Sequence, residues 1–596
     1  MFQSFEVTAR PEQGPPRLAA LRAELVAEGL DGFLVPRADA HQGEYVSARD
    51  ERLAWLTGFT GSAGFCAALR NVAGVFIDGR YRTQVKAQVA SEFTPVPWPE
   101  TSLTDWLPEQ LPEGGRIGFD PWLHTPGQIE QAEQGLAGSS VVLVQCENLV
   151  DRVWSDQPGP AKEQAKVHPD SFAGETHAAK RARLATSLQA DEVASAVITL
   201  PDSICWLLNI RGSDIPRNLI VQCFAILHAS GQVDLFIDPA KLVEVRDHLG
   251  TDVTCHPPDD FLETLKGLEG PVRLDKSSVP VIVADVIGDR AAWGDDPCAL
   301  PKACKNAAEI AGSAEAHLRD GAAVVELLAW LDAQAPSSLR ETLVVTQLEQ
   351  FRRRDNALQD ISFETIAGTG PNGAIMHYRV TEETDSTLED GHLIVLDSGG
   401  QYLDGTTDIT RTIAIGTPPP EACAAFTRVL LGMIGMSRLI WPKGLAGRDI
   451  EAIGRAPLWY AHQDFDHGLG HGVGAYLSVH EGPQRLSRVS TVPLEPGMIL
   501  SNEPGYYREG GFGIRIENLI VVQEAECPRG GDAHRDMLSW RTLTFAPIDR
   551  RLIVPDMLDA TSRAWLNAYH AETLEKIGPR VSDTARTWLE RACTPL

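Results

Sequence analysis

Five side chains of types that bind divalent metal ions occur in order along the chain: Asp397, Asp408, His471, Glu503 and Glu517. Asp397 and Asp408 lie in apolar, β-branched runs bounded by glycine, which is typical of two neighbouring strands. The glycine-rich segment between them fits a hairpin that brings the two carboxylates face to face. Four carboxylates and one imidazole favour Mn²⁺, Co²⁺ or Zn²⁺ in a carboxylate-bridged pair over a structural zinc bound by thiolates. These residues therefore predict a two-metal hydrolase site.

The local sequences around the later ligands are also distinctive. His471 lies in the glycine-spaced HGLGHGVG, Glu503 in MILSNEPGYY, and Glu517 in FGIRIENLIVV, which alternates like a strand. Any one of these residues alone has common structural roles, but the five in this order are specific. The pattern resembles that of the pita-bread metallopeptidases, and most closely the long, three-domain Xaa-Pro aminopeptidases (the aminopeptidase P family).

The resemblance implies a role for each ligand. Asp397 would chelate one metal ion, Asp408 and Glu517 would bridge both, and His471 and Glu503 would complete the shell of the other. Two cations lower the pKa of a bridging water toward neutrality, so a hydroxide is available to attack the scissile carbonyl. Glu503 is the expected catalytic group that carries the proton to the leaving nitrogen.

Other residues of the catalytic region are expected to contact the substrate. By the same resemblance, His377 and His480 are catalytic and substrate-binding residues that hydrogen-bond the peptide carbonyl or the tetrahedral intermediate. His467 is expected near the residue beyond the scissile bond, or alternatively in a structural role within its glycine-rich loop. Arg515, two residues before Glu517, is expected on the same sheet face, where it would support the ligands, bind substrate or form a structural salt bridge.

The composition indicates a soluble, multidomain protein. The 596 residues exceed what one hydrophobic core supports, and 81 acidic against 53 basic residues give a net charge of -28. Such an acidic surface argues against nucleic acid and anionic membranes as partners. The ten cysteines show no CxxC pair, and neither an apolar leader nor an 18-residue apolar run is present. We therefore expect a cytoplasmic protein with reduced thiols.

The first half of the chain shows an internal repeat. The first copy comprises a helix at 17–29, the strand DGFLVP, the strand pattern RLAWLTGFTGSAG and the strand GVFIDGRY. Its counterparts in the second copy begin with a helix at 176–190 and continue through SICWLLNIRGSD and VDLFIDP. Trp55 aligns with Trp206, and Phe76 with Phe236. The repeat predicts a duplicated α/β fold, and the resemblance identifies both copies as creatinase-like domains.

The remainder alternates helix and strand, as expected for a pita-bread domain of mixed α/β (α+β) class. We predict creatinase-like domains at 1–158 and 159–303, a pita-bread catalytic domain at 304–540, and a carboxyl-terminal extension at 541–596 packed on it. In that extension Trp565, Leu566 and Tyr569 have the spacing of a packed helix face.

These observations predict a metal-dependent aminopeptidase that removes the residue preceding a proline in second position. The resemblance implies two divalent ions, with Mn²⁺ favoured over Zn²⁺ or Co²⁺, and a homodimer. A prolidase, which takes only dipeptides, shares the ligand set but typically has one amino-terminal domain. A non-catalytic pita-bread module that binds peptides or proteins is a third interpretation, which four concentrated carboxylates disfavour.

Overall fold

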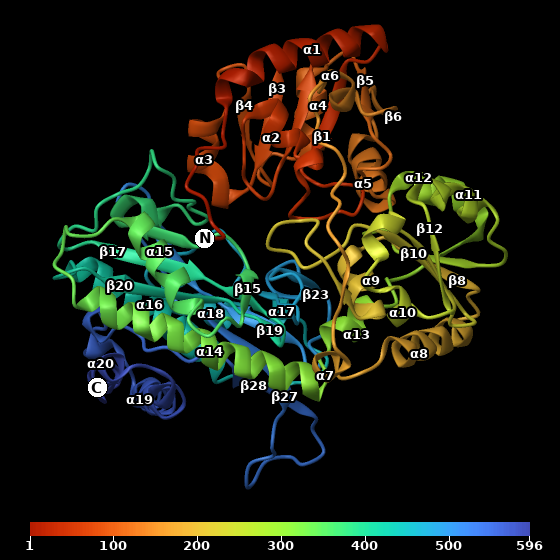
Figure 1. Cartoon of the computed structure of the whole chain (residues 1–596). Coiled ribbons are helices and arrows are strands. Elements are labelled where there is room, and N and C mark those ends of the chain that lie inside the picture. The colour runs from red at the N-terminus through yellow and green to blue at the C-terminus, as the bar shows by residue number, and fades with distance from the viewer. The chain divides into compact units, whose positions relative to one another are not determined.

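The computed structural model describes residues 1–596, which divide into two compact units. The amino-terminal unit comprises Thr8–Asp170 and Glu175–Ala299, and the carboxyl-terminal unit comprises Met1–Val7, Ser171–Gly174 and Leu300–Leu596. Both units mix helices and strands (Figure 1), which confirms the predicted class. None of the helices combines the length and apolar character needed to cross a bilayer. The boundaries of the four predicted domains stay predictions.

The amino-terminal unit contains two six-stranded sheets with the same topology, β4-β3-β2-β1-β5-β6 and β12-β11-β10-β8-β13-β14. In each sheet one central strand, β1 or β8, is antiparallel to one neighbour and parallel to the other. The predicted duplication is therefore confirmed. The strands are β1 (Gly32–Pro36), β2 (Phe65–Leu69), β3 (Ala73–Ile77), β4 (Thr94–Pro97), β5 (Gly115–Phe119), β6 (Val141–Gln145), β8 (Ser195–Ile198), β10 (Phe224–His228), β11 (Val233–Phe236), β12 (Val253–His256), β13 (Val272–Leu274) and β14 (Ala291–Trp293).

One element of each repeat differs from the prediction. The pattern of RLAWLTGFTGSAG predicts a strand, yet Arg52–Thr57 form the helix α2, and its counterpart is α9 (Pro201–Leu208). Leu53 and Leu56 lie one turn apart and are both buried. Gly58, with φ +86°, ends α2 in the left-handed conformation that glycine adopts without strain. The other helices of this unit are α1 (Gly14–Ala27), α3 (Arg82–Gln88), α4 (Leu103–Gln110), α5 (Pro126–Leu136), α6 (Leu149–Val153), α8 (His177–Ala190), α10 (Arg246–Leu249), α11 (Phe261–Lys266) and α12 (Val281–Ile287).

The carboxyl-terminal unit is built on antiparallel sheets that helices cover. Two three-stranded sheets have the orders β15-β18-β19 and β16-β17-β20, and a six-stranded sheet has the order β21-β28-β27-β24-β22-β23. A further pair, β25-β26, lies against β17 and β20 through β26. The strands are β15 (Leu358–Ile361), β16 (Ile366–Thr369), β17 (Leu393–Ser398), β18 (Gly400–Tyr402), β19 (Gly405–Thr406), β20 (Ile409–Ala414), β21 (Ile440–Pro442), β22 (Gly470–Gly472), β23 (Glu481–Leu486), β24 (Ile499–Asn502), β25 (Gly505–Arg508), β26 (Phe512–Arg515), β27 (Asn518–Glu524) and β28 (Met537–Thr542).

The helix α14 (Ala307–Asp332) is the longest of this unit. Its first turn is capped by Asn306, whose side chain accepts hydrogen bonds from the backbone N–H groups of Ala308 and Glu309, while Glu309 accepts from the Asn306 N–H. Val324, Leu327 and Leu331 are buried along its inner face. The other helices are α7 (Asp170–Ala173), α13 (Ala299–Ala303), α15 (Glu341–Arg352), α16 (Pro420–Ser437), α17 (Gly447–Ile450), α18 (Ala452–Trp459), α19 (Ala560–Ile577) and α20 (Asp583–Ala592).

The two ends of the chain pack on this same unit. Leu566 and Tyr569 of α19 are buried in the core that includes Phe426 of α16, as the apolar spacing predicts. At the other end, the backbone N–H of Phe2 donates to both carboxylate oxygens of Glu349 at 2.9 Å. The first residues of the chain therefore stabilise the carboxyl-terminal unit, an association that the sequence does not indicate.

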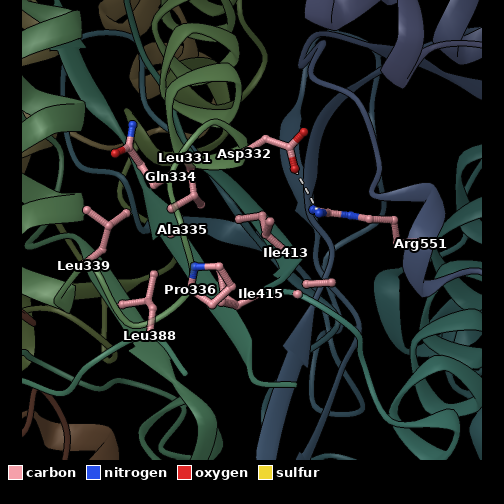
Figure 2. A pocket seen from close by; sticks show the side chains of 12 residues that line it. Leu331, Asp332, Gln334, Ala335, Pro336, Leu339, Leu388, Ile413, Ile415 and Arg551 are labelled. Carbon is pink, nitrogen blue, oxygen red and sulfur yellow. Dashed lines mark hydrogen bonds and ion pairs between the residues drawn. The ribbon is translucent and has the colours of Figure 1, made fainter. Parts of the chain in front are cut away.

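One cavity, of about 190 Å³, lies beside the carboxyl end of α14 (Figure 2). Its walls are mainly apolar and include Leu331, Leu339 and Ile413. The charged group at its edge, Arg551, is paired with Asp332 at 2.9 Å. None of the predicted metal ligands or substrate-binding residues lines this cavity, so it is separate from the candidate site.

Candidate metal centre

The first two ligands belong to one three-stranded sheet, with Asp397 in its central strand β17 and Asp408 next to its edge strand β20. Strands β17 and β20 are antiparallel, and Asp397 of β17 pairs with Thr410 of β20. Asp408 immediately precedes β20, so the strands predicted from the local sequence bring the two carboxylates to the same region. The connection is longer than a simple turn, because β18 and β19 form within it and join β15 in a separate sheet.

The remaining ligands come from the six-stranded sheet. His471 is in β22, Glu503 follows the last residue of β24, and Glu517 precedes the first residue of β27. Because Asn502 pairs with Asn518 in antiparallel β24 and β27, Glu503 and Glu517 leave the sheet at the same end. Glu517 therefore lies between β26 and β27 and not within a continuous strand as predicted.

The ligand atoms converge closely. Atoms of Asp408, His471 and Glu517 all lie within 4.8 Å of one another. The Nε2 atom of His471 is 3.5 Å from Oδ2 of Asp408 and 3.4 Å from Oε1 of Glu503. The backbone N–H of Glu517 donates to the Thr410 carbonyl at 3.1 Å, which connects the two sheets at the site.

Two hydrogen bonds hold His471 in place, one to its ring and one to its backbone. Its Nδ1 lies 3.0 Å from the carbonyl oxygen of Gly472, which only accepts, so Nδ1 carries a proton and Nε2 is the ring atom that would bind a metal ion. The hydroxyl of Ser501 accepts from the His471 backbone N–H at 2.9 Å and donates to Oε1 of Glu503 at 3.0 Å. Ser501 thus couples the positions of two ligands.

The inner part of this cluster is buried. Asp408 is 3% exposed and Glu517 is 1% exposed. Burial raises the pKa of Asp408 well above its usual range, and the nearby charges of Asp397 and Glu503 raise it further. Burial likewise raises the pKa of Glu517, with Asp408 and Glu503 adding to the effect. Carboxylates crowded in this way are strongly destabilised unless positive charge is close to them.

Three carboxylate oxygens of the cluster are buried without a hydrogen-bond partner: Oδ1 of Asp397, Oδ1 of Asp408 and Oε1 of Glu517. Buried polar atoms are nearly always paired, so three such oxygens in one place require an explanation. Hard oxygen ligands with one imidazole fit divalent cations such as Mn²⁺, Co²⁺ or Zn²⁺. The residues present therefore fit a centre of divalent metal ions.

Arg515 is the cationic side chain that pairs with this cluster. Its Nη2 is 2.6 Å from Oδ2 of Asp397, and it is 3% exposed. Its Nη1 donates to the hydroxyl of Tyr507 at 2.6 Å, and that hydroxyl donates to Nε2 of His467, 3.0 Å away. Nδ1 of His467 in turn donates to the Gly468 carbonyl at 2.7 Å. A chain of hydrogen bonds therefore connects His467 to the predicted ligand Asp397. Three roles are expected for Arg515 from the sequence, and its contact with Asp397 favours the one in which it supports the ligands.

The other two predicted histidines flank the cluster differently. The rings of His480 and His471 meet edge to face, with centroids 4.3 Å apart. His377 is half-buried and follows Met376, whose carbonyl accepts a hydrogen bond from Arg515 at 3.3 Å. His480 is thus in direct contact with a ligand, whereas His377 is connected to the cluster through its neighbour's backbone.

Sequence reasoning misses two residues that support the site and leaves a third undecided. Thr410 donates through Oγ1 to Oε2 of Glu517 at 2.8 Å, and Ser501 contacts two ligands. Thr410 in β20 is two residues after Asp408, and Ser501 in β24 is two residues before Glu503, so the strand period of two indicates their orientation. Tyr507 is the last residue of the MILSNEPGYY segment around Glu503, a context that fits either packing or a place in the cleft. Burial raises its pKa to about 12.

Comparisons with known proteins show the family of this chain. The model for metallopeptidase family M24 matches residues 311–524, and that for its carboxyl-terminal region matches residues 536–596. Models for creatinase/prolidase amino-terminal domains match residues 17–153 and 156–309. The chain belongs to metallopeptidase family M24.

Within that family the chain is similar over its full length to named relatives. It is 38% identical to the probable Xaa-Pro aminopeptidase P of Aspergillus fumigatus, over 97% of this chain and 92% of that protein. It is 36% identical to aminopeptidase P2 of Arabidopsis thaliana, over 95% of this chain and 86% of that protein. A crystal structure of a Caenorhabditis elegans X-prolyl aminopeptidase, described as a cytosolic enzyme with a di-nuclear active site, superposes with a TM-score of 0.93 at 32% identity and covers 98% of this chain and 100% of that chain.

Proposed function

We propose that this chain is a metal-dependent aminopeptidase that hydrolyses the amino-terminal Xaa-Pro bond of peptides. The observation that carries the proposal is the convergence of Asp397, Asp408, His471, Glu503 and Glu517, with three orphaned buried oxygens, in a chain that matches Xaa-Pro aminopeptidases over its full length. Two divalent ions are the proposed cofactor, and Mn²⁺ is favoured over Zn²⁺ or Co²⁺ because the ligand set is rich in carboxylates.

Divalent cations held by these five residues would supply Lewis acidity for the scissile carbonyl and lower the pKa of a water molecule. Glu503 is the proton carrier in this proposal, since it is partly exposed at the edge of the cluster, where it can reach both water and the leaving nitrogen. Ser501 fixes one of its oxygens at 3.0 Å, which limits the conformations that the carboxylate adopts.

The histidines bind and orient the substrate in this proposal. His480, in edge contact with His471, and His377 donate hydrogen bonds to the peptide carbonyl as negative charge develops on its oxygen. His467 lies at the outer end of the chain through Tyr507 and Arg515, where it would contact the residue beyond the scissile bond. Arg515 holds Asp397 in place and neutralises part of the cluster's charge.

Two other functions share features of this site. A prolidase is the nearer alternative. However, a dipeptidase of this fold, PepE of Mycobacterium ulcerans, matches only 62% of this chain, although the match spans 96% of that protein, at 25% identity and a TM-score of 0.50. The long chain therefore favours the aminopeptidase. A binding module without activity is disfavoured because it has no use for the unpaired buried oxygens of three carboxylates.

The surroundings of the enzyme are also part of the proposal. Peptides with proline in second position are the substrates, and the net charge of -28 disfavours nucleic acid and anionic membranes as partners. A cytoplasmic location fits the description of the Caenorhabditis elegans enzyme as cytosolic. A homodimer is proposed from the resemblance to the family.

The test is hydrolysis of Arg-Pro-Pro, Gly-Pro and Arg-Ala-Pro by metal-stripped protein, before and after Mn²⁺ is added. Release of arginine from Arg-Pro-Pro only with metal, and none from Arg-Ala-Pro, is the expected result. Cleavage confined to Gly-Pro would replace the proposal with a prolidase. No cleavage with Mn²⁺, Zn²⁺ or Co²⁺ would support the binding module.

A further inference from the structure

The segment that carries His377 leaves strand β16 and contains a short turn at Gly370–Ala374. Its inner side is tied to the metal cluster, because Arg515 donates to the Met376 carbonyl while it pairs with Asp397. The same segment passes close to β26, since a Cβ added at Gly513 would meet the Gly373 carbonyl. The position of His377 relative to the cluster therefore depends on how firmly this segment is held.

The other side of the segment is held by one carboxylate, that of Glu341 at the start of α15. Glu341 is 0% exposed. Its Oε1 accepts from the Thr369 backbone N–H at 2.7 Å, and both of its oxygens accept from the Asn372 side-chain amide at 3.1 Å. Its Oε2 accepts from the Tyr378 hydroxyl at 2.8 Å and from the Ser386 backbone N–H at 3.1 Å. This one side chain therefore fixes the segment at several points along its length.

These contacts flank His377 closely. Tyr378 follows His377 directly and is 4% exposed. Its hydroxyl bonds Glu341, which lies 37 residues earlier in the chain. Asn372, five residues before His377, donates to the same carboxylate and to the Tyr378 hydroxyl at 2.9 Å. A displacement of the carboxylate is therefore transmitted to the backbone on both sides of the histidine.

We propose that Glu341 and Tyr378 are positioning residues, which hold the segment 369–378 so that His377 reaches the peptide carbonyl. The inference rests on the proposed function, because it assigns His377 to substrate. Neither residue contacts the predicted metal ligands, and both act through His377.

The cost of this arrangement supports a role beyond stability. Burial raises the pKa of Glu341 to about 7, although the hydrogen bonds from Thr369, Tyr378 and Asn372 oppose the shift. Burying a carboxylate among neutral donors costs more than an apolar contact of similar size would. Residues that break the rules of stable packing in this way are concentrated at functional sites.

The test is a double-mutant cycle between Tyr378→Phe and His377→Ala. For each variant, kcat/KM for Arg-Pro-Pro is measured with Mn²⁺, and slow variants are measured in single-turnover reactions with enzyme in excess over peptide. Tyr378→Phe removes one hydroxyl and keeps the ring. We expect it to lower kcat/KM by about tenfold in the wild-type background, within the range for small misplacement of a catalytic group. In the His377→Ala background we expect less than about a twofold effect, since the group that Tyr378 positions is gone.

Matched variants separate positioning from a general loss of structure. Tyr402→Phe removes a hydroxyl that donates to Asp320 at 2.7 Å in the same unit, and we expect it to leave kcat/KM within about twofold. Glu341→Gln keeps the shape of the side chain but loses one acceptor oxygen. Like Tyr378→Phe, it should lower kcat/KM in the wild-type background and have less than about a twofold effect in the His377→Ala background, with metal content unchanged.

Two outcomes contradict the account in different ways. An equal loss for Tyr378→Phe with and without His377 would overturn the positioning role while the proposed function stands. Wild-type protein that fails to cleave Arg-Pro-Pro with any divalent ion would overturn the proposed function and this inference with it.

Discussion

Arg515 offers a sharp test of how the cluster is supported. Its guanidinium is 2.6 Å from Asp397, 2.6 Å from the Tyr507 hydroxyl and 3.2 Å from Oγ1 of Thr410. Arg515→Lys keeps the positive charge but provides one compact ammonium in place of a planar fork, so it satisfies at most part of these hydrogen bonds. Arg515→Met removes the charge and retains much of the volume.

The expected size of the effect follows from the hydrogen bonds that each variant removes. A hydrogen bond to a charged group contributes about 1.5–3 kcal/mol, and removal of a partner that orients a metal ligand lowers metal affinity or activity by about 10–100-fold. We expect Arg515→Lys to lower Mn²⁺ affinity by about tenfold and Arg515→Met by about 100-fold, with kcat/KM falling in parallel. The measurement is competition of the metal-stripped protein with a fluorescent chelator, followed by hydrolysis of Arg-Pro-Pro.

A matched control lies in the amino-terminal unit. Arg52 is 6% exposed and pairs with Asp151 at 2.7 Å and with Asp50 at 2.9 Å. Arg52→Lys therefore imposes a similar packing change away from the ligands, and we expect Mn²⁺ affinity to stay within about twofold. Wild-type affinity in Arg515→Met, or an equal loss of affinity in Arg52→Lys, would refute the reasoning.

Three further predictions concern metal retention, pH and packing. Asp408→Asn should lower bound Mn²⁺, measured by mass spectrometry of the dialysed protein, because it removes a buried ligand charge. Burial, with Arg411 and Arg550 nearby, lowers the pKa of His570 to about 4. The unfolded chain therefore takes up a proton as pH falls from about 6.5 to about 4, and the folded state loses about 3 kcal/mol of stability. His570→Gln should remove that part of the pH dependence in urea unfolding, and an unchanged profile would contradict it. Leu566→Ala, at a fully buried position of α19, should lower unfolding stability by about 2–5 kcal/mol, and a smaller loss would show that α19 packs loosely.

Several features are predictable because their signals are local. The duplicated α/β order follows from repeated apolar patterns, and strands β17 and β20 follow from β-branched runs around Asp397 and Asp408. The error at Arg52–Thr57 has a local cause as well. A run of six residues is too short for its period to distinguish a helix from a strand.

The supports of the site are less accessible to sequence reasoning because their partners are distant. Glu341 reaches Thr369, Tyr378 and Ser386 across intervals of 28, 37 and 45 residues. No periodic pattern encodes such contacts, which arise only when α15, β16 and the loops beside them pack together. Arg515 is an intermediate case, since its strand position is predictable while its contacts with Asp397 and Tyr507 depend on the tertiary structure.

The central claim is that the five ligands hold two divalent ions on which peptide hydrolysis depends. Its most direct test is titration of Mn²⁺ into metal-stripped protein, with bound metal and arginine release from Arg-Pro-Pro followed in the same samples. Activity that rises to a plateau at two equivalents of bound metal per chain, and that is absent in Asp408→Asn, is the predicted result. Full activity in the metal-stripped protein, or activity that reaches its plateau while no metal is bound at the site, would contradict the account.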